Sequence, residues 1–135
     1  MEIKRKYDLE ERLIEFAVQI IRITESLHNT RAGIHVGGQL VRSGTSPALH
    51  YGEAQSAESR PDFIHKIKVV LKELRETKNA LTIIKRVPLT DKMEIVDKAM
   101  AESNELISIF VKSLETAKKN LEDEKKQKRK NNDDK

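Results

Sequence analysis

Residues 39–55 read Gln-Leu-Val-Arg-Ser-Gly-Thr-Ser-Pro-Ala-Leu-His-Tyr-Gly-Glu-Ala-Gln, and the rest of the chain is best understood from this stretch. On an ideal helix at 100° per residue, its polar side chains fall within one arc of about 100°. We call this set the polar seam: Gln39, Arg42, Ser43, Ser46, His50 and Glu53. Small and apolar residues occupy the rest of the circumference, the reverse of an ordinary surface helix. The pattern predicts a helix that is buried on most of its surface.

Small residues recur every four positions in the same stretch, at Gly44, Ala48 and Gly52. A glycine costs up to ~1 kcal/mol of helix propensity, so we expect close packing of another backbone to compensate. Pro47 removes the hydrogen bond to the Ser43 carbonyl, which predicts either a bend or an interruption of the helix. The apolar surface of this helix exceeds the needs of a four-helix core, and such a surplus favours a homo-oligomer.

Length and composition indicate one soluble helical domain. The chain has 135 residues, 36% of them charged and 4% aromatic, with five Gly and three Pro. This composition is typical of a helical bundle. The absence of cysteine excludes disulfides and thiolate metal sites. No apolar run approaches the ~20 residues of a membrane span, and the N-terminus lacks the apolar core of a signal peptide. We therefore expect a cytoplasmic protein that makes no membrane contact.

The segment before the polar seam reads as an amphipathic helix. Apolar residues recur at spacings of three and four from Leu9 to Leu27. Asp8 is the predicted N-cap, with Glu11 completing a box-like pair, and the helix is expected to end near Asn29. The helix of the polar seam follows over residues 31–57, with Thr30 as its predicted cap.

Two more helices follow with the same apolar rhythm. Ser59 is the predicted cap of the third, with Pro61 in its first turn, and Val87-Pro88-Leu89 ends it. Thr90 or Asp91 is expected to cap the fourth, whose apolar repeat runs to Leu121. Short connections between the helices predict an all-α, antiparallel up-down-up-down four-helix bundle over residues 1–121. Residues 122–135 contain no apolar residue, and we expect a charged, disordered tail there.

The third predicted helix has a basic face. Four cations share an arc of about 60° with Asn79, opposite the apolar repeat. We call them the basic ridge: Lys68, Lys72, Arg75 and Arg86. Such a ridge can follow a phosphate backbone, although a plain solvated face is the simpler interpretation. Few aromatic residues are present to stack bases, so base-specific recognition of single strands is not expected. The Lys125–Lys130 run could add a loose electrostatic tether.

The polar seam itself has two interpretations. Its members are neighbours at spacings of three and four and can satisfy one another. Arg42 and Glu53 lie about 16 Å apart along the axis, so they cannot pair within the helix. A buried unpaired charge is costly, so each would need a partner from another helix or subunit. The seam is therefore either a structural interface or a surface that contacts a ligand or nucleic acid.

Signs of catalysis or metal binding are weak. Glu25 and His28 match the Glu-x-x-His spacing of di-iron bundles, but that site requires a second copy that the chain lacks. Ser46 and His50 share a helix face without a nucleophile-elbow signature. Gly37-Gly38 lacks the following Lys-Ser/Thr of a phosphate-binding loop. We predict a non-enzymatic protein with no catalytic residues, metal or cofactor.

A family resemblance appears at this point. Residues 39–54, together with Ser59, Asp62-Phe63 and residues 72–77, resemble the bacterial 23S rRNA-intervening-sequence proteins, and the similarity covers roughly residues 8–120. His50 and Pro47 depart from the common pattern, which has Asn and a small or apolar residue there. The resemblance implies four-helix protomers in homopentameric barrels without enzymatic activity. A related branch, the accessory variability proteins of diversity-generating retroelements, binds nucleic acid and works with a reverse transcriptase.

Two hypotheses about function follow. The favoured one is a non-enzymatic oligomer, expected to be a pentamer, that binds RNA or DNA electrostatically through the basic ridge and the tail. The alternative is a scaffold that binds another protein, with its charge serving solubility alone. The salt dependence of binding separates them, because phosphate contacts weaken steeply as salt rises.

Overall fold

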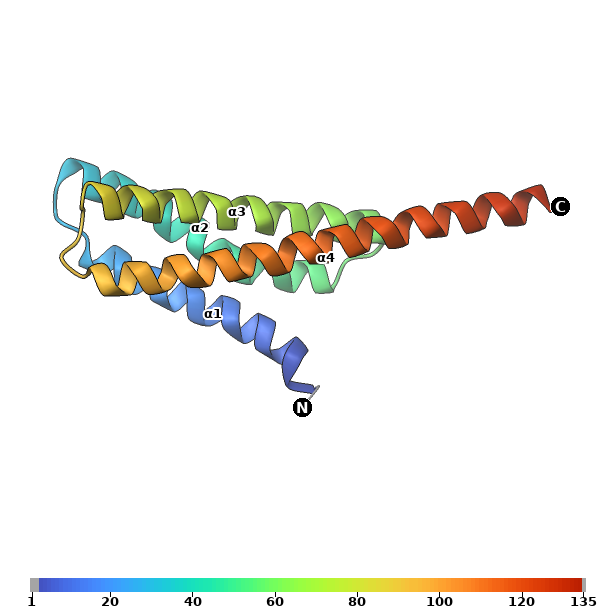
Figure 1. Cartoon of the computed structure of the whole chain (residues 1–135), viewed down its shortest axis with the longest axis horizontal. Helices are drawn as coiled ribbons and strands as arrows, with labels where there is room; N and C mark the ends of the chain where they lie inside the picture. Colours follow the sequence, from blue (N-terminus) through green and yellow to red (C-terminus); the bar gives the residue numbers. More distant parts are fainter. Residues whose placement is uncertain (1–2, 135) are drawn as a thin grey trace.

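Four α-helices run up and down in chain order, as Figure 1 shows, which confirms the all-α prediction. The computed structural model describes residues 3–134, with side chains from Leu9 onward. Consecutive helices pack against each other, and α1 also contacts α4. The helices are α1 (Ile3–Ser26), α2 (Arg31–Gln55), α3 (Arg60–Arg86) and α4 (Met93–Asp133).

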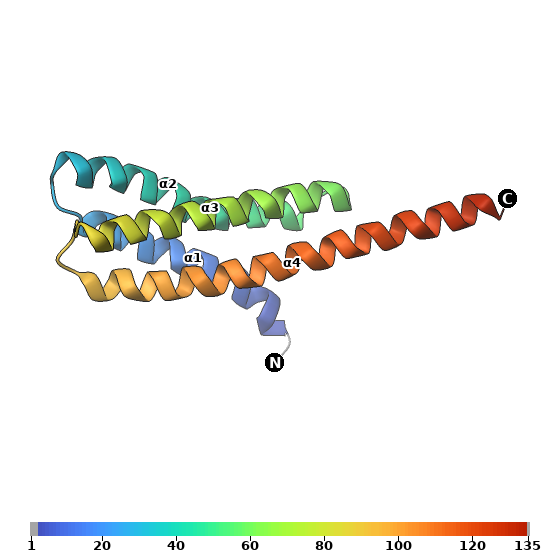
Figure 2. The same ribbon diagram turned by 45° about the horizontal axis from the view of Figure 1, so that its top comes forward.

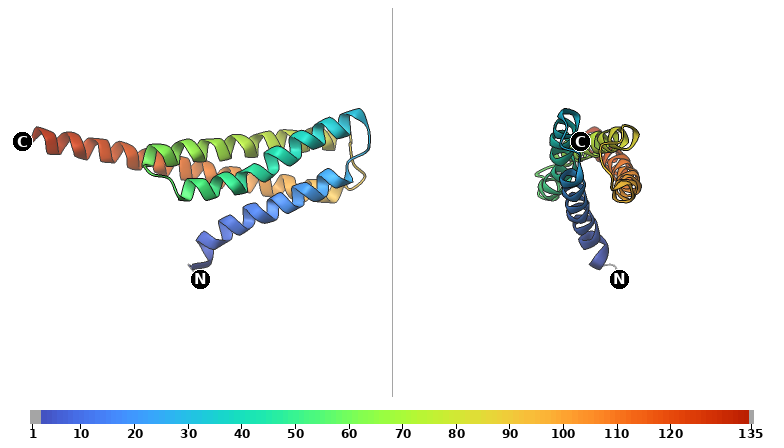
Figure 3. Two further views of the ribbon diagram at one scale, coloured as in Figure 1. Left: turned by 180° about the vertical axis from the view of Figure 1, so that it is seen from behind. Right: turned by 90° about the vertical axis from the view of Figure 1, so that its left-hand side faces the viewer.

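The first helix diverges from the others toward its N-terminus, as the views in Figures 2 and 3 agree. An ion pair fastens it to α4 where the two are still close. The guanidinium of Arg12 donates to both carboxylate oxygens of Glu102, at 3.1 and 2.7 Å, and to Glu105 at 3.2 Å. The hydrogen bond to Glu102 raises the pKa of Arg12. The bundle is thus closed along α2, α3 and α4 and opens toward the start of α1.

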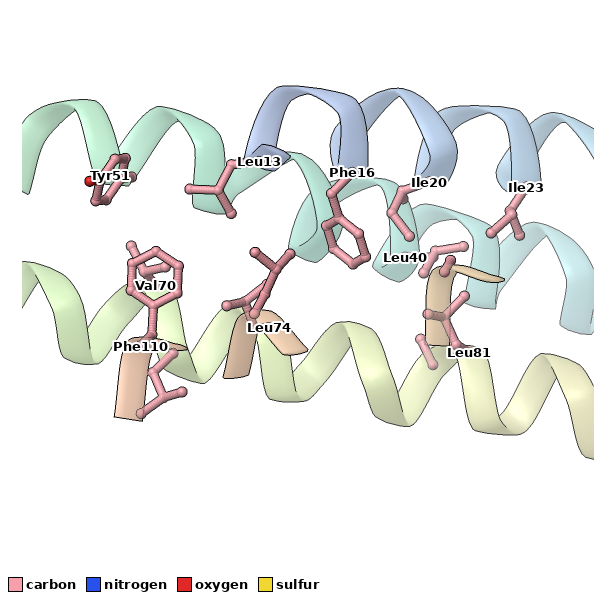
Figure 4. Packing of buried hydrophobic residues seen from close by; sticks show 14 of the residues in the cluster. Leu13, Phe16, Ile20, Ile23, Leu40, Tyr51, Val70, Leu74, Leu81 and Phe110 are labelled. Carbon is pink, nitrogen blue, oxygen red and sulfur yellow. The ribbon is translucent and has the colours of Figure 1, made fainter. Parts of the chain in front are cut away.

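The apolar repeats meet in one core, shown in Figure 4. Phe16 of α1, Leu40 of α2, Leu74 of α3 and Phe110 of α4 are all almost completely buried. The Phe110 ring meets the ring of Tyr51 edge to face, with centroids 5.6 Å apart, a favoured aromatic geometry. The spacings of three and four therefore identified the faces that the bundle buries.

Two of the predicted helix caps are confirmed. Thr30 Oγ1 accepts a hydrogen bond from the Gly33 amide at 3.0 Å, and Ser59 Oγ accepts one from the Asp62 amide at 3.2 Å. The predicted cap of the fourth helix is wrong, because α4 begins at Met93. Thr90 is buried instead, with its hydroxyl 2.9 Å from that of Ser26, so it joins the two neighbouring loops.

Both ends of the chain are more helical than predicted. The first helix begins at Ile3, so Asp8 lies inside it and does not cap it. The last helix continues to Asp133 where a disordered tail was expected. Glu, Lys, Gln and Arg dominate residues 122–133, and these are strong helix formers with opposite charges four apart. The lack of apolar residues means that this segment has no apolar face to bury, not that its backbone is irregular.

The central stretch forms one uninterrupted helix through Pro47, so the interruption considered from the sequence is wrong. Gly44 is packed as predicted: a Cβ there would lie 2.6 Å from Cγ2 of Ile20. Gly52 is not, since nothing lies within 4 Å of its Cβ position. Leu49 is 71% exposed and Ile34 66% exposed. Within a single chain α2 is therefore buried on one side only, so the predicted burial over most of its surface is not reached without a second copy of the chain.

Candidate nucleic-acid interface

Packing of α2 on α3 places the polar seam beside the basic ridge. Two side-chain contacts join α2 to α3 at successive positions along the helices. The hydroxyl oxygens of Ser43 and Thr77 lie 3.0 Å apart, and Nδ1 of His50 lies 2.8 Å from Oε1 of Glu73. The two regions that the sequence marked separately are thus neighbours on one side of the molecule.

The inner members of the polar seam serve the fold. Ser43 is buried, and its hydroxyl meets the buried Thr77 hydroxyl between the helices. Ser46 Oγ donates to the Arg42 carbonyl of its own helix at 2.7 Å. His50 is half-buried against Glu73. The sequence predicted contacts within the seam, but His50 reaches another helix instead of Ser46 or Glu53.

The outer members of the seam face solvent. Gln39, Arg42 and Glu53 are all exposed, and Arg42 Nη2 donates to Oε1 of Gln39 at 2.7 Å. From the helix pattern we expected Arg42 and Glu53 to be buried charges that need partners from elsewhere. Water solvates both, so that requirement disappears. These residues are free to contact a ligand.

The basic ridge is exposed and uncompensated. Lys68, Lys72, Arg75 and Arg86 are all exposed, and within residues 9–134 none of them belongs to an ion pair. From Lys68 to Arg86 the ridge spans about 27 Å at 1.5 Å per residue.

Three other cations of α3 behave differently, while Lys78 belongs to no ion pair among residues 9–134. Arg60 pairs with Glu124 at 2.8 Å, Lys66 with Asp62 at 2.9 Å and Lys85 with Asp97 at 2.7 Å. The hydrogen bond from Lys66 lowers the pKa of Asp62. Acidic partners are therefore supplied to the flanks of α3 but not to its ridge, although four cations this close repel one another.

A cavity of about 410 Å³ lies between α2 and α3, and we call it the α2–α3 groove. Gln39, Arg42 and Ser43 of the seam line it, and so does Asn79, which lies on the arc of the ridge. The sequence did not identify its other lining residues, which include Val36, Glu76, Ala80 and Ile83. One signal was available: Thr77 occupies a position of the apolar repeat, and a hydroxyl there requires a buried partner.

The Glu-x-x-His spacing of α1 leads to a loop contact and not to a metal cluster. His28 has its Nε2 3.0 Å from Oδ1 of Asp91 in the neighbouring loop. Among the side chains from Leu9 to Asp134, no group of three or more His, Asp or Glu residues is placed to hold a metal ion. No helix in the described part of the chain is long and apolar enough to cross a membrane.

The fold and its surfaces define a small up-down four-helix protein with a basic outer face. A family model described as 23S rRNA-intervening sequence protein matches residues 5–112. A crystal structure of a protein with unknown function from the S23 ribosomal protein family of Bacteroides thetaiotaomicron VPI-5482 is similar, with a TM-score of 0.71 and 31% identity. The match covers 78% of this chain and 97% of that chain. No curated protein matches.

The chain therefore belongs to the 23S rRNA-intervening sequence protein family. This confirms the resemblance stated from residues 39–54 and the helices that follow them.

The hydroxyl pair between α2 and α3 allows a test of its structural role. We expect Ser43→Ala or Thr77→Val alone to lower the free energy of unfolding by about 1–3 kcal/mol, because each leaves the other buried hydroxyl without its cross-helix partner. The double variant should lose less than the sum of the two. Urea denaturation of all four proteins measures this coupling, and strict additivity would contradict it.

Proposed function

We propose that this protein is a non-enzymatic nucleic-acid binding protein whose basic ridge contacts the phosphate backbone of RNA or DNA. One observation supports this above the others. The four ridge cations have no acidic partner among the described residues, whereas three cations on the flanks of the same helix do. Sets of unpaired cations in a row are the usual electrostatic footprint of a phosphate-binding surface.

Ridge geometry also suits a polyanion better than a single small anion. The side chains follow the axis of a rigid helix and do not converge on one point. A linear arrangement of charges can meet successive phosphates, each of which releases condensed counterions on binding. The interaction we propose is therefore with the backbone and depends weakly on sequence.

A salt titration tests this function. The observed binding constant for B-DNA falls with salt at a slope of about −0.9 per phosphate contact, and for a single strand at about −0.7. Four contacts predict a loss of roughly 100-fold between 50 and 200 mM salt for each bound protomer. Fluorescence anisotropy with labelled single-stranded and duplex oligonucleotides measures it. Absence of binding at low salt contradicts the proposal and favours the protein scaffold.

We also propose that the chain assembles with copies of itself, a pentamer being the state that its family resemblance implies. The outward face of α2 supports self-association. Ile34 and Leu49 are exposed there, and no atom lies within 4 Å of a Cβ at Gly38 or Gly52. Glycines inside an exposed helix face weaken the helix unless another element packs closely on them. Repetition of the ridge around an oligomer would multiply the phosphate contacts.

Light scattering tests the assembly. Five chains of 15.5 kDa predict a mass of about 78 kDa. We expect Ile34→Glu with Leu49→Glu to give monomers, because a charge buried in an apolar interface is strongly unfavourable. Val87→Glu, at a residue 59% exposed beyond the end of α3, is the control and should leave the mass unchanged. A monomeric wild type would contradict self-association.

A further inference from the structure

The basic ridge has a gap without cations, and the α2–α3 groove lies beside this gap. Between Arg75 and Arg86 the same side of α3 presents Asn79 and Ile83, which both line the groove. A strand whose phosphates rest on the cations at either end must therefore pass over the groove.

We propose that the α2–α3 groove receives one unpaired nucleobase with an amino group where uracil and guanine have a carbonyl, namely adenine (N6) or cytosine (N4), while the ridge binds the neighbouring phosphates. This inference rests on the proposed function and adds to it a preference among bases. The shared chemistry is that of the base, so RNA and DNA are both candidate sources.

Hydrogen-bonding groups at the groove favour an amino-bearing base. The Asn79 amide makes no hydrogen bond to any other described side chain or to the described backbone, and Glu76 is likewise absent from every ion pair among residues 9–134. Carboxylate and amide oxygens accept hydrogen bonds from amino groups such as adenine N6 and cytosine N4. Uracil and thymine present a carbonyl oxygen at that position, which the acceptor-only Glu76 carboxylate repels, although the Asn79 amide could donate to it.

Position and charge also set the orientation of the nucleotide. The Glu76 carboxylate and the Arg42 guanidinium line the groove and offset each other's charge, whereas the four unpaired cations of the ridge lie outside it. A phosphate is therefore attracted more strongly to the ridge than to the groove, so the base enters and the phosphate stays out.

Apolar side chains provide a place for the base ring. Val36 of α2 and Ala80 and Ile83 of α3 line the groove, and Ile83 is 49% exposed. The scarcity of aromatic residues argued against stacking of bases along a strand. Aliphatic side chains can nevertheless cover the faces of a single ring, with the amides contributing the specificity. A cavity of about 410 Å³ is at the small end of ligand sites, a suitable size for one base.

Competition between strands of equal length tests the inference. Oligoadenylate, oligocytidylate, oligouridylate and an abasic strand would each be titrated at one salt concentration, in ribose and deoxyribose form, with the full-length protein. We expect adenine and cytosine strands to bind about 10-fold tighter than uracil or abasic strands, the discrimination typical of one bidentate contact. The preference should appear in both sugar series.

A variant pair assigns the preference to the groove. Glu76→Gln with Asn79→Ala removes the carboxylate and the unpaired amide that line the groove and leaves the ridge cations in place. We expect this variant to bind adenine, cytosine and uracil strands with similar affinity and with an unaltered salt slope. Glu122→Gln with Asn104→Ala, an exposed carboxylate and an exposed amide on α4, is the matched control and should keep the preference.

The outcomes are distinguishable. Salt-sensitive binding that is equal for abasic and base-bearing strands overturns the base pocket and leaves the ridge function standing. A preference that survives in the Glu76/Asn79 variant overturns the assignment to the groove. No binding to any strand at low salt overturns the proposed function, and the base pocket with it.

Discussion

Changing Lys68, Lys72, Arg75 and Arg86 together to glutamine is expected to lower nucleic-acid affinity by at least about 100-fold at 50 mM salt. Each cation that meets a phosphate releases counterions, and a neutral side chain of similar length does not. The slope of log K against log salt should also flatten by about one unit for each cation that no longer meets a phosphate. Fluorescence anisotropy over a range of salt concentrations measures both quantities in the same experiment.

The control removes charge from the same helix without touching the ridge. Arg60, Lys66 and Lys85 are changed to glutamine, which breaks three ion pairs on the flanks of α3. Exposed ion pairs contribute little to stability, so this variant should fold normally. We expect its affinity to fall far less than that of the ridge variant. Equal losses in the two variants would show that net charge alone governs binding and would contradict a specific ridge.

Phe110→Ala is expected to have the largest effect on stability. The side chain is fully buried in the core and packs edge to face on Tyr51 with ring centroids 5.6 Å apart. Truncation removes the buried ring and leaves a cavity that neighbouring helices cannot fill completely. Comparable Phe→Ala changes cost about 3–5 kcal/mol, a large share of the stability of a domain of this size.

Urea denaturation followed by circular dichroism measures this loss at one fixed protein concentration, because assembly would make the midpoint depend on concentration. Val87→Ala is the control at an exposed apolar residue and should change the free energy of unfolding by less than about 0.5 kcal/mol. A cost below about 1 kcal/mol for Phe110→Ala would contradict the tight core around Tyr51. Comparison of the two variants shows whether the loss of stability comes from truncating a buried side chain or from removing apolar atoms at any position.

Membership in the family is compatible with the basic ridge and with the α2–α3 groove, but it assigns no role to either surface. The related crystal structure covers nearly all of its own chain at 31% identity, which supports the same four-helix arrangement. Its description as a protein with unknown function leaves activity to be tested on chains such as this one. The salt titration and the strand competition address that question directly, since both can be carried out before the physiological partner is identified.

The candidate site was only partly predictable. The arc of Lys68, Lys72, Arg75 and Arg86 follows from helix periodicity alone, and all four are exposed as expected. Whether a cation of α3 has an acidic partner depends on whether a neighbouring helix places a carboxylate beside it. Asp97 and Glu124 of α4 reach the flanks of α3 and not its ridge. No pattern within one helix contains that information.

Local patterns in the sequence predicted the existence of the four helices, two of their caps and the faces that they bury, but not where the first helix begins or the last one ends. The reason is physical: apolar spacing of three and four, and hydroxyls at Thr30 and Ser59, act within one or two turns. The highly charged end of α4 was harder to predict. It lacks apolar residues, which suggested disorder, but its residues are good helix formers and it is helical.

The division of the polar seam and the position of the groove depend on how the helices pack in three dimensions. Ser43 and His50 turn to α3, while Gln39 and Arg42 remain at the surface beside Asn79. A helix wheel places all of the seam residues on one arc, but the crossing of α2 over α3 buries one edge of that arc and exposes the other. Contacts between residues far apart in the chain depend on packing, and packing is settled by the whole core rather than by any single helix.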